Sequence, residues 1–360
     1  MFRNSLLTMK NYLLVMAGGI GSRFWPVSSE QYPKQFLDFL GTGMSLLQQT
    51  IHRFEGIVEH ENIFILTNER YKTIVLDQLG WIKPSQILCE PVRRNTAPCI
   101  AYAVERIKTL CGDANIIVSP ADHLVLNVKE FQRVVSKGLD FIEKNDALLT
   151  LGMKPTRPET GYGYIQFHKE DADEKECQSE ICKVLKFTEK PNLEKAMAFL
   201  KEGNFLWNAG IFLWRLKTID KAISDYIPEL YDKLQTVKQW MGTTKENERI
   251  KELFPSLPDI SVDYGILEKA DNIYVLPADF GWSDVGTWGS LFQLRSRDDN
   301  NNTATPNDNV KFFNASGNIV HLSTLKNAVI EGLNDYIVAE ADGTLLICSL
   351  KNEQEIKHFH

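Results

Sequence analysis

The chain has 360 residues, of which 43% are hydrophobic and 24% are charged, as in an ordinary globular protein. This length predicts one large domain and a smaller one rather than a single small core. A formal net charge of -7 without a dense run of Lys or Arg argues against nucleic acid and anionic membranes as general partners. An anionic small-molecule substrate would therefore need a local cluster of positive charge.

The first predicted element is a buried strand, YLLVM at residues 12–16. A signal peptide fits less well, because Lys10 and Asn11 interrupt the apolar residues. No apolar run reaches the ~18 residues of a membrane span. The six cysteines are scattered without a CxxC pair, which favours core thiols in a reducing cytoplasm over a disulfide framework or a zinc site. We therefore expect a cytoplasmic protein.

Strand-like and helix-like segments alternate as far as residue 152. Strand-like runs lie at residues 12–16, 62–67, 86–90, 115–120 and 147–152, and amphipathic segments begin near Ser45, Glu69, Thr96 and Lys129. This alternation predicts an α/β fold in which helices cover both faces of a largely parallel sheet. Ligands of such open sheets bind outside the carboxyl ends of the strands, so the loops there are the places to search for a site.

The pattern becomes less regular after residue 152. Strands are expected at residues 160–167, 182–191 and 208–214, and helical segments at residues 192–200 and 218–253. The polar stretch at residues 295–309 is the best candidate for a domain boundary. We expect a main domain at residues 1–295 and a small β-rich domain at residues 305–360, for which a left-handed β-helix-like solenoid is one interpretation.

The loop after the first strand has the composition of a phosphate-binding turn. In VMAGGIGSRFWPVSSEQYPKQFL, residues 15–37, Phe24 stands where a dinucleotide fingerprint needs Gly or Ala, and the Walker A lysine is missing. What remains is a glycine-rich turn whose N–H groups can approach phosphate oxygens, with Arg23 and Lys34 to supply charge. The alternative is a tight turn carrying two surface cations.

Asp122 follows the strand-like run at residues 115–120 and so belongs at the carboxyl end of a strand. A Mg²⁺ ion takes one or two carboxylates and shares its other positions between phosphates and water. Two roles are therefore open for Asp122: ligation of a metal ion, or formation of a turn, which is a frequent role of Asp.

Seven motifs in the chain resemble those of the sugar-nucleotide pyrophosphorylases, and specifically the mannose-1-phosphate guanylyltransferases. They are GGIGSRFWPVSSEQYPKQF, EPVRRNTAPCI, SPADHLV, TGYGYIQ, FTEKPN, WNAGIFLW and GWSDVGTWGSL, and they occur in family order over nearly the whole chain. The resemblance implies a Rossmann-like nucleotidyltransferase fold of the glycosyltransferase-A type, with residues 1–295 as the catalytic domain. It implies the reaction of GTP with mannose 1-phosphate to give GDP-mannose and diphosphate.

The resemblance also implies roles for individual residues. Arg23 and Lys34 would be catalytic, and Asp122 and Asp284 would hold Mg²⁺, with Mn²⁺ as an alternative. The nucleotide would be bound by Ala17, Gly18, Gly19, Gly21, Ser22, Arg23, Lys34, Asn95, Thr96 and Asp122. For the loop at residues 93–98, capping of the following helix by Asn95 or Thr96 is an open alternative to reading guanine.

The sugar phosphate would be bound by Gly161, Glu189, Lys190, Asn208 and Asp263. Glycine lets the backbone approach the sugar closely. Since some family members continue into an isomerase domain, the resemblance implies a monofunctional enzyme here. A nucleotidyltransferase for another sugar 1-phosphate or base, a non-catalytic GDP-mannose sensor, and assembly as a homodimer stay open.

Overall fold

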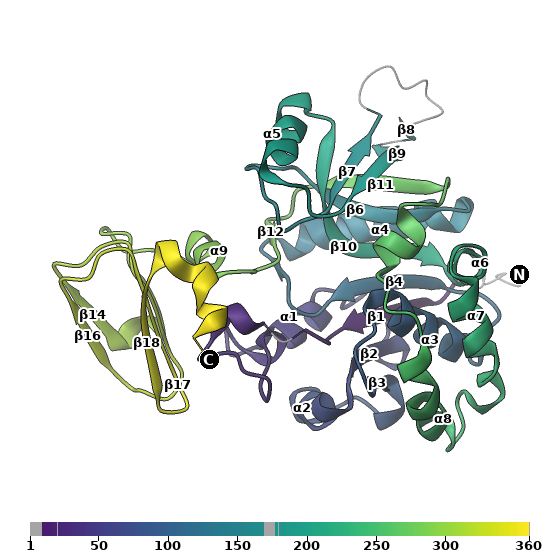
Figure 1. The fold of residues 1–360 in the computed structure, drawn as a ribbon, viewed down its shortest axis with the longest axis horizontal. Coiled ribbons are helices and arrows are strands. Elements are labelled where there is room, and N and C mark those ends of the chain that lie inside the picture. Colours follow the sequence, from purple (N-terminus) through teal and green to yellow (C-terminus); the bar gives the residue numbers. More distant parts are fainter. Residues whose placement is uncertain (1–8, 20, 169–176, 179, 360) are drawn as a thin grey trace, which may run out of the picture. The chain divides into compact units, whose positions relative to one another are not determined.

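The computed structural model describes residues 9–19, 21–168, 177–178 and 180–359 (Figure 1). Its contacts divide the chain into two compact units. Unit 1 comprises Met1–Gly18, Arg53–Pro120 and Val125–Trp282, and unit 2 comprises Gly19–His52, Ala121–Leu124 and Ser283–His360. The predicted domains at 1–295 and 305–360 divide the chain at other points and remain a prediction about its domains.

Unit 1 is built on a sheet that has ten strands among the described residues, in the order β3-β2-β1-β4-β10-β6-β11-β9-β7, with β8 beside β9. The strands are β1 (Asn11–Met16), β2 (Ile63–Asn68), β3 (Ile87–Glu90), β4 (Asn115–Pro120), β6 (Leu148–Met153), β7 (Tyr164–Phe167), β8 (Cys177–Gln178), β9 (Ile181–Thr188), β10 (Phe205–Arg215) and β11 (Ile273–Ala278). Strands β1 to β4 are mutually parallel, and so are β6 and β11, whereas β10 runs antiparallel to β4 and β6. The expected mixed, mainly parallel α/β sheet is confirmed.

Helices pack around this sheet (Figure 1). They are α2 (Lys72–Gln78), α3 (Thr96–Lys108), α4 (Val128–Lys144), α5 (Leu193–Glu202), α6 (Leu216–Tyr226), α7 (Pro228–Gln235) and α8 (Glu246–Leu253). Four of them, α3, α6, α7 and α8, bury one continuous apolar core with the sheet. The helical stretch expected at 218–253 is divided into three helices. Pro228 cannot donate within a preceding helix and begins α7, and Gly242 adopts a left-handed conformation before α8.

The sheet reverses its strand order between β1 and β4. Met16, the last residue of β1, is the register partner of Pro120, the last residue of β4. Open α/β sheets bind ligands outside the carboxyl ends of the strands at such a reversal. The chain leaves unit 1 after Gly18 and again after Pro120, so the glycine-rich turn and the Asp122 segment both begin at this reversal.

Unit 2 contains helices, short turns and a coil of β strands. Its elements include η1 (Ser22–Phe24), η2 (Lys34–Phe36), α1 (Leu46–His52), α9 (Trp288–Leu294), β13 (Thr303–Thr305), β14 (Val310–Phe313), β15 (Ile319–Leu322), β16 (Ala328–Glu331), β17 (Tyr336–Ala341), β18 (Thr344–Ser349) and η10 (Leu350–His358). Two parallel ladders, β13-β15-β17 and β14-β16, alternate along the chain, which is the arrangement of a β-solenoid. The predicted small β-rich region is confirmed, and its left-handed twist stays a prediction. Two further strands, β5 (Leu124–Val125) and β12 (Trp282–Ser283), lie where the chain passes between the units.

A single apolar cluster joins the loop after β1 to α9 and to the β-solenoid of unit 2. The ring of Phe24 lies 4.6 Å from that of Phe39 and 5.2 Å from that of Trp288, measured between centroids. The same cluster contains Ile319 and Ile337 from the β-solenoid. The loop that follows β1 is therefore folded onto the C-terminal strands.

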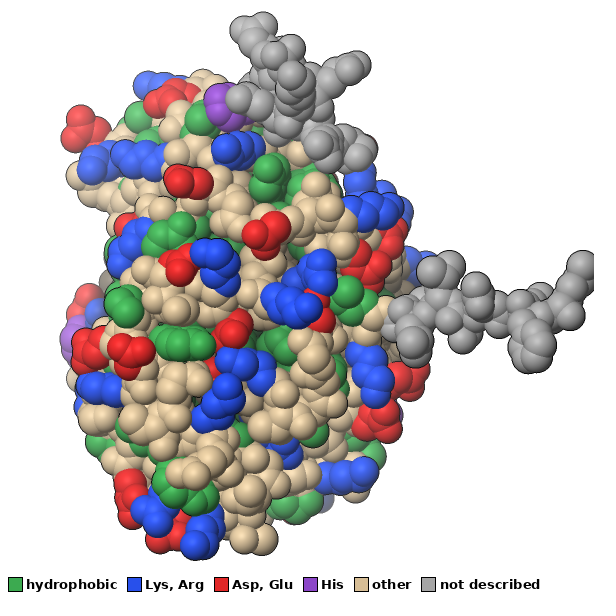
Figure 2. All heavy atoms as spheres, turned by 90° about the vertical axis from the view of Figure 1, so that its right-hand side faces the viewer, with side chains coloured by type: hydrophobic (Ala, Val, Ile, Leu, Met, Phe, Trp, Pro, Cys, Tyr) green, Lys and Arg blue, Asp and Glu red, His purple; other side chains and the backbone are tan. Residues whose placement is uncertain are grey.

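No helix in the described part of the chain is long and apolar enough to cross a membrane. On the face drawn in Figure 2, Lys and Arg side chains are interspersed with Asp and Glu, and neither sign forms a continuous patch. The cytoplasmic location and the homodimer remain predictions.

Candidate active site

The glycine-rich turn of unit 2 is tightly packed at one of its glycines. Gly21 has a φ of 71°, and a Cβ at this position would lie 2.4 Å from the Cβ of Lys34. The turn continues into η1, where the Phe24 N–H donates to the Gly21 carbonyl at 3.0 Å. Both the backbone conformation and the close approach require glycine here.

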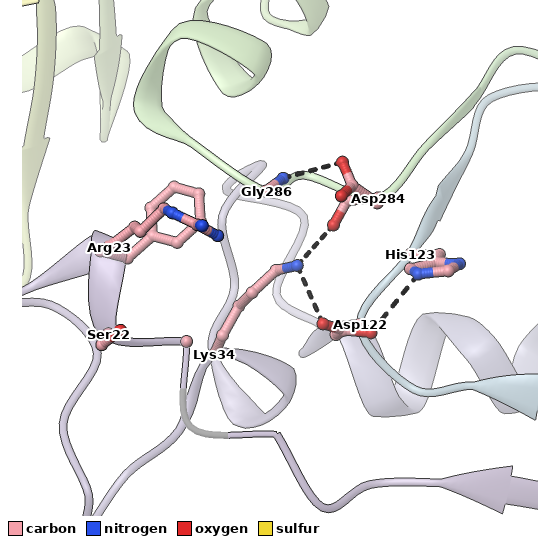
Figure 3. A pocket seen from close by; sticks show the side chains of 9 residues that line it. Ser22, Arg23, Lys34, Asp122, His123, Asp284 and Gly286 are labelled. Carbon is pink, nitrogen blue, oxygen red and sulfur yellow. Dashed lines mark hydrogen bonds and ion pairs between the residues drawn. The ribbon is translucent and has the colours of Figure 1, made fainter. Parts of the chain in front are cut away.

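A pocket of about 240 Å³ lies beside this turn (Figure 3). It is lined by Gly21, Ser22, Arg23, Phe24, Lys34, Asp122, His123, Asp284 and Gly286, all from unit 2. Three segments far apart in the sequence thus contribute to one cavity. The structure brings together both predicted catalytic cations, both predicted metal ligands, and two residues of the predicted nucleotide-binding turn.

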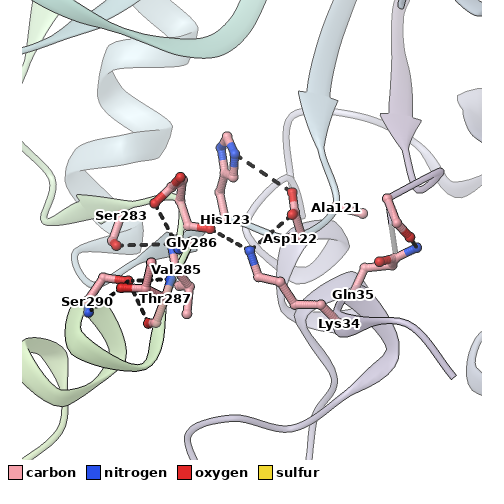
Figure 4. Close-up of polar contacts among 12 residues, drawn as sticks. Lys34, Gln35, Ala121, Asp122, His123, Ser283, Val285, Gly286, Thr287 and Ser290 are labelled. Carbon is pink, nitrogen blue, oxygen red and sulfur yellow. Dashed lines mark hydrogen bonds and ion pairs between the residues drawn. The ribbon is translucent and has the colours of Figure 1, made fainter. Parts of the chain in front are cut away.

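Lys34 is held by two oxygen atoms. Its side chain is buried, and its Nζ donates to Asp122 Oδ2 at 3.0 Å (Figures 3 and 4). The same Nζ donates to the Asp284 carbonyl at 2.5 Å (Figure 3). The two partners lie 88 and 250 residues away in the chain. Lys34 is therefore a fixed charge in the pocket wall and not a solvated surface lysine.

The charge on Lys34 keeps Asp122 ionised. Burial alone would raise the pKa of Asp122. The charges of Lys34 and His123 outweigh burial and bring this pKa below its ordinary value. His123 Nε2 lies 3.7 Å from Asp122 Oδ1. On the opposite side of Lys34, Asp284 Oδ1 accepts from the Gly286 N–H at 3.0 Å (Figure 3). The pocket thus presents carboxylates from two separate loops.

These carboxylates suit a hard divalent cation. Asp122 and Asp284 offer oxygen donors on one cavity wall, and Mg²⁺ takes one or two carboxylates together with phosphates and water. Among the described residues, no group of three or more His, Cys, Asp or Glu side chains is placed to hold a metal alone. The donor set therefore fits an ion shared with a phosphate ligand.

Arg23 is the exposed cation of the pocket. Within the described residues, its guanidinium has no hydrogen-bond or ion-pair partner, and no dashed line reaches it in Figure 3. A guanidinium in this state can bind two phosphate oxygens at once. Of the other residues predicted to bind nucleotide, Ala17 is buried in unit 1 and donates to the Leu66 carbonyl, whereas Gly18 has open space around it.

The loop predicted to read the base caps a helix of unit 1. Asn95 is the N-cap of α3, with a φ of 64°, and its Oδ1 accepts from the Thr96 N–H at 3.1 Å. Thr96 Oγ1 accepts from the Val262 N–H at 2.9 Å. Capping by Asn95 is thereby established, and its contact with guanine remains a prediction.

Four of the predicted sugar-phosphate residues form a cluster in unit 1. Asn208 Nδ2 donates to Asp263 Oδ1 at 2.9 Å, and Lys190 Nζ lies 2.7 Å from Glu189 Oε1. Burial and the neighbouring charge of Glu189 raise the pKa of Asp263 to about 6. The cluster therefore offers donors and acceptors of the kind that sugar hydroxyls need.

Gly163, two residues beyond the predicted Gly161, is the glycine that approaches this cluster. A Cβ at Gly163 would lie 2.5 Å from Glu189 Oε2, and its carbonyl accepts from the Asn208 N–H at 2.8 Å. Gly161 is exposed and instead contacts Glu159. Only Gly161 was predicted from the sequence, although TGYGY contains both glycines; contact of Gly161 with the sugar remains a prediction.

Comparisons with known proteins identify relatives of this chain. A family model described as nucleotidyl transferase matches residues 12–301. A mannose-1-phosphate guanylyltransferase of Salmonella montevideo is 37% identical over 351 residues, which are 96% of this chain and 72% of that protein. One from Escherichia coli (strain K12) is 34% identical over 353 residues, which are 97% of this chain and 72% of that protein.

A solved structure described as mannose-1-phosphate geranyltransferase from Thermus thermophilus superposes with a TM-score of 0.85 and 28% identity, covering 97% of this chain and 98% of that one. The fold and the matching family model define the class as Rossmann-like nucleotidyltransferases. Within this class, the chain belongs to the mannose-1-phosphate guanylyltransferase family. Because the curated relatives extend beyond the matched region, the monofunctional character stays a prediction.

Proposed function

We propose that the protein transfers GMP from GTP to mannose 1-phosphate, giving GDP-mannose and diphosphate. The observation that carries this proposal is the pocket in which Lys34 is fixed by Asp122 and Asp284 beside the exposed Arg23. The names of the similar relatives supply the sugar and the base. In this reaction a phosphate oxygen of the sugar attacks the α-phosphorus of GTP, and charge builds on the diphosphate leaving group.

The chain's own residues have to position and neutralise two anionic reactants. Arg23 would bind two triphosphate oxygens, and Lys34 would act as a point charge fixed against the same group. The sugar phosphate is already ionised at neutral pH, so no general base is needed. His123 would shape the site through its contact with Asp122.

Asp122 and Asp284 would hold Mg²⁺, with Mn²⁺ as a substitute. With two cationic side chains and two carboxylates, the pocket has no surplus charge to offset a triphosphate. A bound divalent ion would supply that surplus at the α-phosphate. The charge count is thus an argument for the metal that does not depend on the family.

For the sugar phosphate, Glu189 and Asp263 would accept hydrogen bonds from hydroxyls and Asn208 would donate to one. Lys190 would pair with the phosphate group, because its ammonium is exposed beside Glu189. Gly161 would allow close backbone approach, and Gly163 would keep the space around Glu189 open.

The test is diphosphate release by the purified chain with Mg²⁺, pairing GTP, ATP, UTP or dTTP with mannose 1-phosphate or glucose 1-phosphate. We expect release with GTP and mannose 1-phosphate only. Release with another pair would keep the chemistry and refute the specificity. If no pair gives diphosphate release but the chain binds GDP-mannose tightly, catalysis is refuted and a GDP-mannose sensor is favoured.

The metal assignment is tested by Asp284→Asn, which keeps an oxygen able to accept from the Gly286 N–H but removes the negative charge. We expect a chelator to abolish release by the unaltered chain, and the variant to need at least about tenfold more Mg²⁺ for half-maximal rate. Titration of Mn²⁺ binding in the presence of GTP provides a readout apart from activity. An unchanged Mg²⁺ requirement would remove Asp284 from the metal site.

A further inference from the structure

Arg295, which follows α9 in unit 2, is a buried cation whose hydrogen bonds go to neutral groups. Its residue is 8% exposed, its Nε donates to the Phe39 carbonyl at 2.9 Å, and its Nη2 donates to the same oxygen. Its Nη1 lies 3.4 Å from the Val320 carbonyl of β15. Burial of a charge is costly unless specific contacts offset it, so these contacts need an explanation.

His321 of β15 provides the fourth contact of this guanidinium. Arg295 Nη2 lies 3.1 Å from His321 Nδ1, and because Arg can only donate, Nδ1 must be the accepting nitrogen of a neutral imidazole. Burial and the charge of Arg295 lower the pKa of His321 to about 3, which keeps the ring neutral at physiological pH. The His321 ring also packs at 5.9 Å from Phe39 and at 6.1 Å from Trp288, between centroids.

The carbonyl that Arg295 holds belongs to the segment that carries Lys34. Lys34 lies in η2, and the chain continues directly from there to Phe39, whose side chain is fully buried in the apolar cluster of unit 2. Arg295 itself ends the helix that begins just after the Asp284 loop. One side chain thus connects the Lys34 segment, the end of the Asp284 segment and strand β15.

We propose that Arg295 is a positioning residue of the active site: through the Phe39 carbonyl it holds the Lys34 segment against β15, and His321 orients its guanidinium. The β-solenoid then contributes to catalysis by setting where the Lys34 ammonium lies. A displacement of about 1 Å in a group of this kind can lower turnover by about a hundredfold. The turnover part of this inference rests on the proposed function, whereas its structural part does not.

Amide hydrogen exchange and steady-state kinetics of the full-length chain test the proposal together. The variants are Arg295→Met, which keeps the stem and removes the donors, Arg295→Lys, which keeps the charge and one contact, and Arg297→Met as the control. Arg297 is exposed two residues further on and lies over the Phe292 ring. Two variants of His321 separate the acceptor from the ring: His321→Asn retains an acceptor and His321→Leu does not.

For Arg295→Met we expect amides in residues 35–40 to exchange about tenfold faster or more. We also expect kcat to fall about tenfold or more, while the KM for mannose 1-phosphate stays within about twofold. Arg295→Lys should lie between this variant and the unaltered chain. His321→Leu should change exchange and kcat as much as Arg295→Met does, whereas His321→Asn should change both much less. Arg297→Met should change neither.

Exchange and kcat in Arg295→Met equal to those of Arg297→Met would overturn the proposal. So would a lower melting temperature with kcat unchanged at temperatures where the variant is folded, because that describes a purely structural residue. If Arg295→Met does not fold, the same two readouts on Arg295→Lys and His321→Leu decide. Faster exchange in a chain that has no transferase activity would reject the proposed function and keep the positioning role.

Discussion

At the scale of single residues, the pocket is defined by how its charges are held. Lys34 is buried and bonded to two oxygens, whereas Arg23 is exposed beside it. The fixed ammonium of Lys34 does not have to reorganise when a phosphate group binds. The exposed guanidinium of Arg23 can adjust its position to two phosphate oxygens. The two cations are thus suited to different parts of one task.

Replacement of Lys34 tests this division. We expect Lys34→Met to lower kcat/KM for GTP by about a hundredfold to a thousandfold, as when one fixed donor to a developing charge is removed. Lys34→Arg should recover little, because a planar fork cannot replace a point charge between Asp122 and the Asp284 carbonyl. Diphosphate release measures the effect, and the exposed Lys311→Met is the control. Full activity in Lys34→Met would refute the assignment.

The Asp263 carboxyl makes stability depend on pH. Its pKa is raised from 3.8 to about 6 by burial and by Glu189. Between these two values the folded chain holds a proton that the unfolded chain releases, so its contribution to stability falls as pH rises from about 4 to about 6. Asp263→Asn lacks this titration and can still accept from Asn208.

Relative to the unaltered chain, we therefore expect Asp263→Asn to gain stability on the order of 2–3 kcal/mol between pH 4 and pH 7. Urea unfolding at a series of pH values measures the difference. A difference that is flat with pH, or that declines as pH rises, would show that the buried carboxyl does not titrate in this window. Loss of transferase activity in the same variant is expected if Asp263 binds the sugar.

At the scale of elements, the turn after β1 depends on one glycine. A Cβ at Gly21 meets the Cβ of Lys34 at 2.4 Å and the Lys34 backbone N at 3.3 Å, so η1 and η2 would have to separate. Gly43 has a similar φ of 80°, and a Cβ there would meet nothing within 4 Å, so this position isolates the effect of the backbone angle.

We expect Gly21→Ala to lose GTP binding by at least about tenfold, and Gly43→Ala to show only the ~1 kcal/mol destabilisation of an alanine at positive φ. Titration of GTP and thermal unfolding compare the two variants. Equal behaviour of the pair would mean that the contact with Lys34 is unimportant and that only the backbone angle matters.

At the scale of the whole molecule, the two compact units divide the chain at other points than the domain boundary predicted from composition at residues 295–309. Phe24, Phe39 and Trp288 share one apolar cluster with Ile319 and Ile337, which lie beyond the predicted boundary. The pocket residues on the Lys34 segment therefore depend on strands that the sequence assigns to another domain.

A chain ending at residue 295 tests which division holds. We expect it to bind a hydrophobic dye and to lose GTP binding, because the apolar cluster of unit 2 is left half formed. A chain ending at residue 358, which lacks only exposed or terminal residues, is the control. A well-folded, GTP-binding chain of 295 residues would support the predicted domain boundary instead.

Much of the fold was predictable because it follows from local pattern. The runs at 12–16, 62–67, 115–120 and 147–152 are apolar stretches of strand length, and they form β1, β2, β4 and β6. Helix α3 begins at Thr96, where the Asn and Pro signals placed a helix start. The helices at 218–253 were harder, because Pro228 sits where one amphipathic pattern passes into the next.

The sequence by itself determined the α/β class, the glycine-rich turn and the residue types of the site, because hydrophobic period, turn chemistry and motif order are local properties. Only the tertiary structure decided that Lys34 is bonded to Asp122 and Asp284, that Gly163 and not Gly161 adjoins Glu189, and that Arg295 holds Phe39. These contacts join residues far apart in the chain or depend on space around a backbone, and no local pattern encodes either.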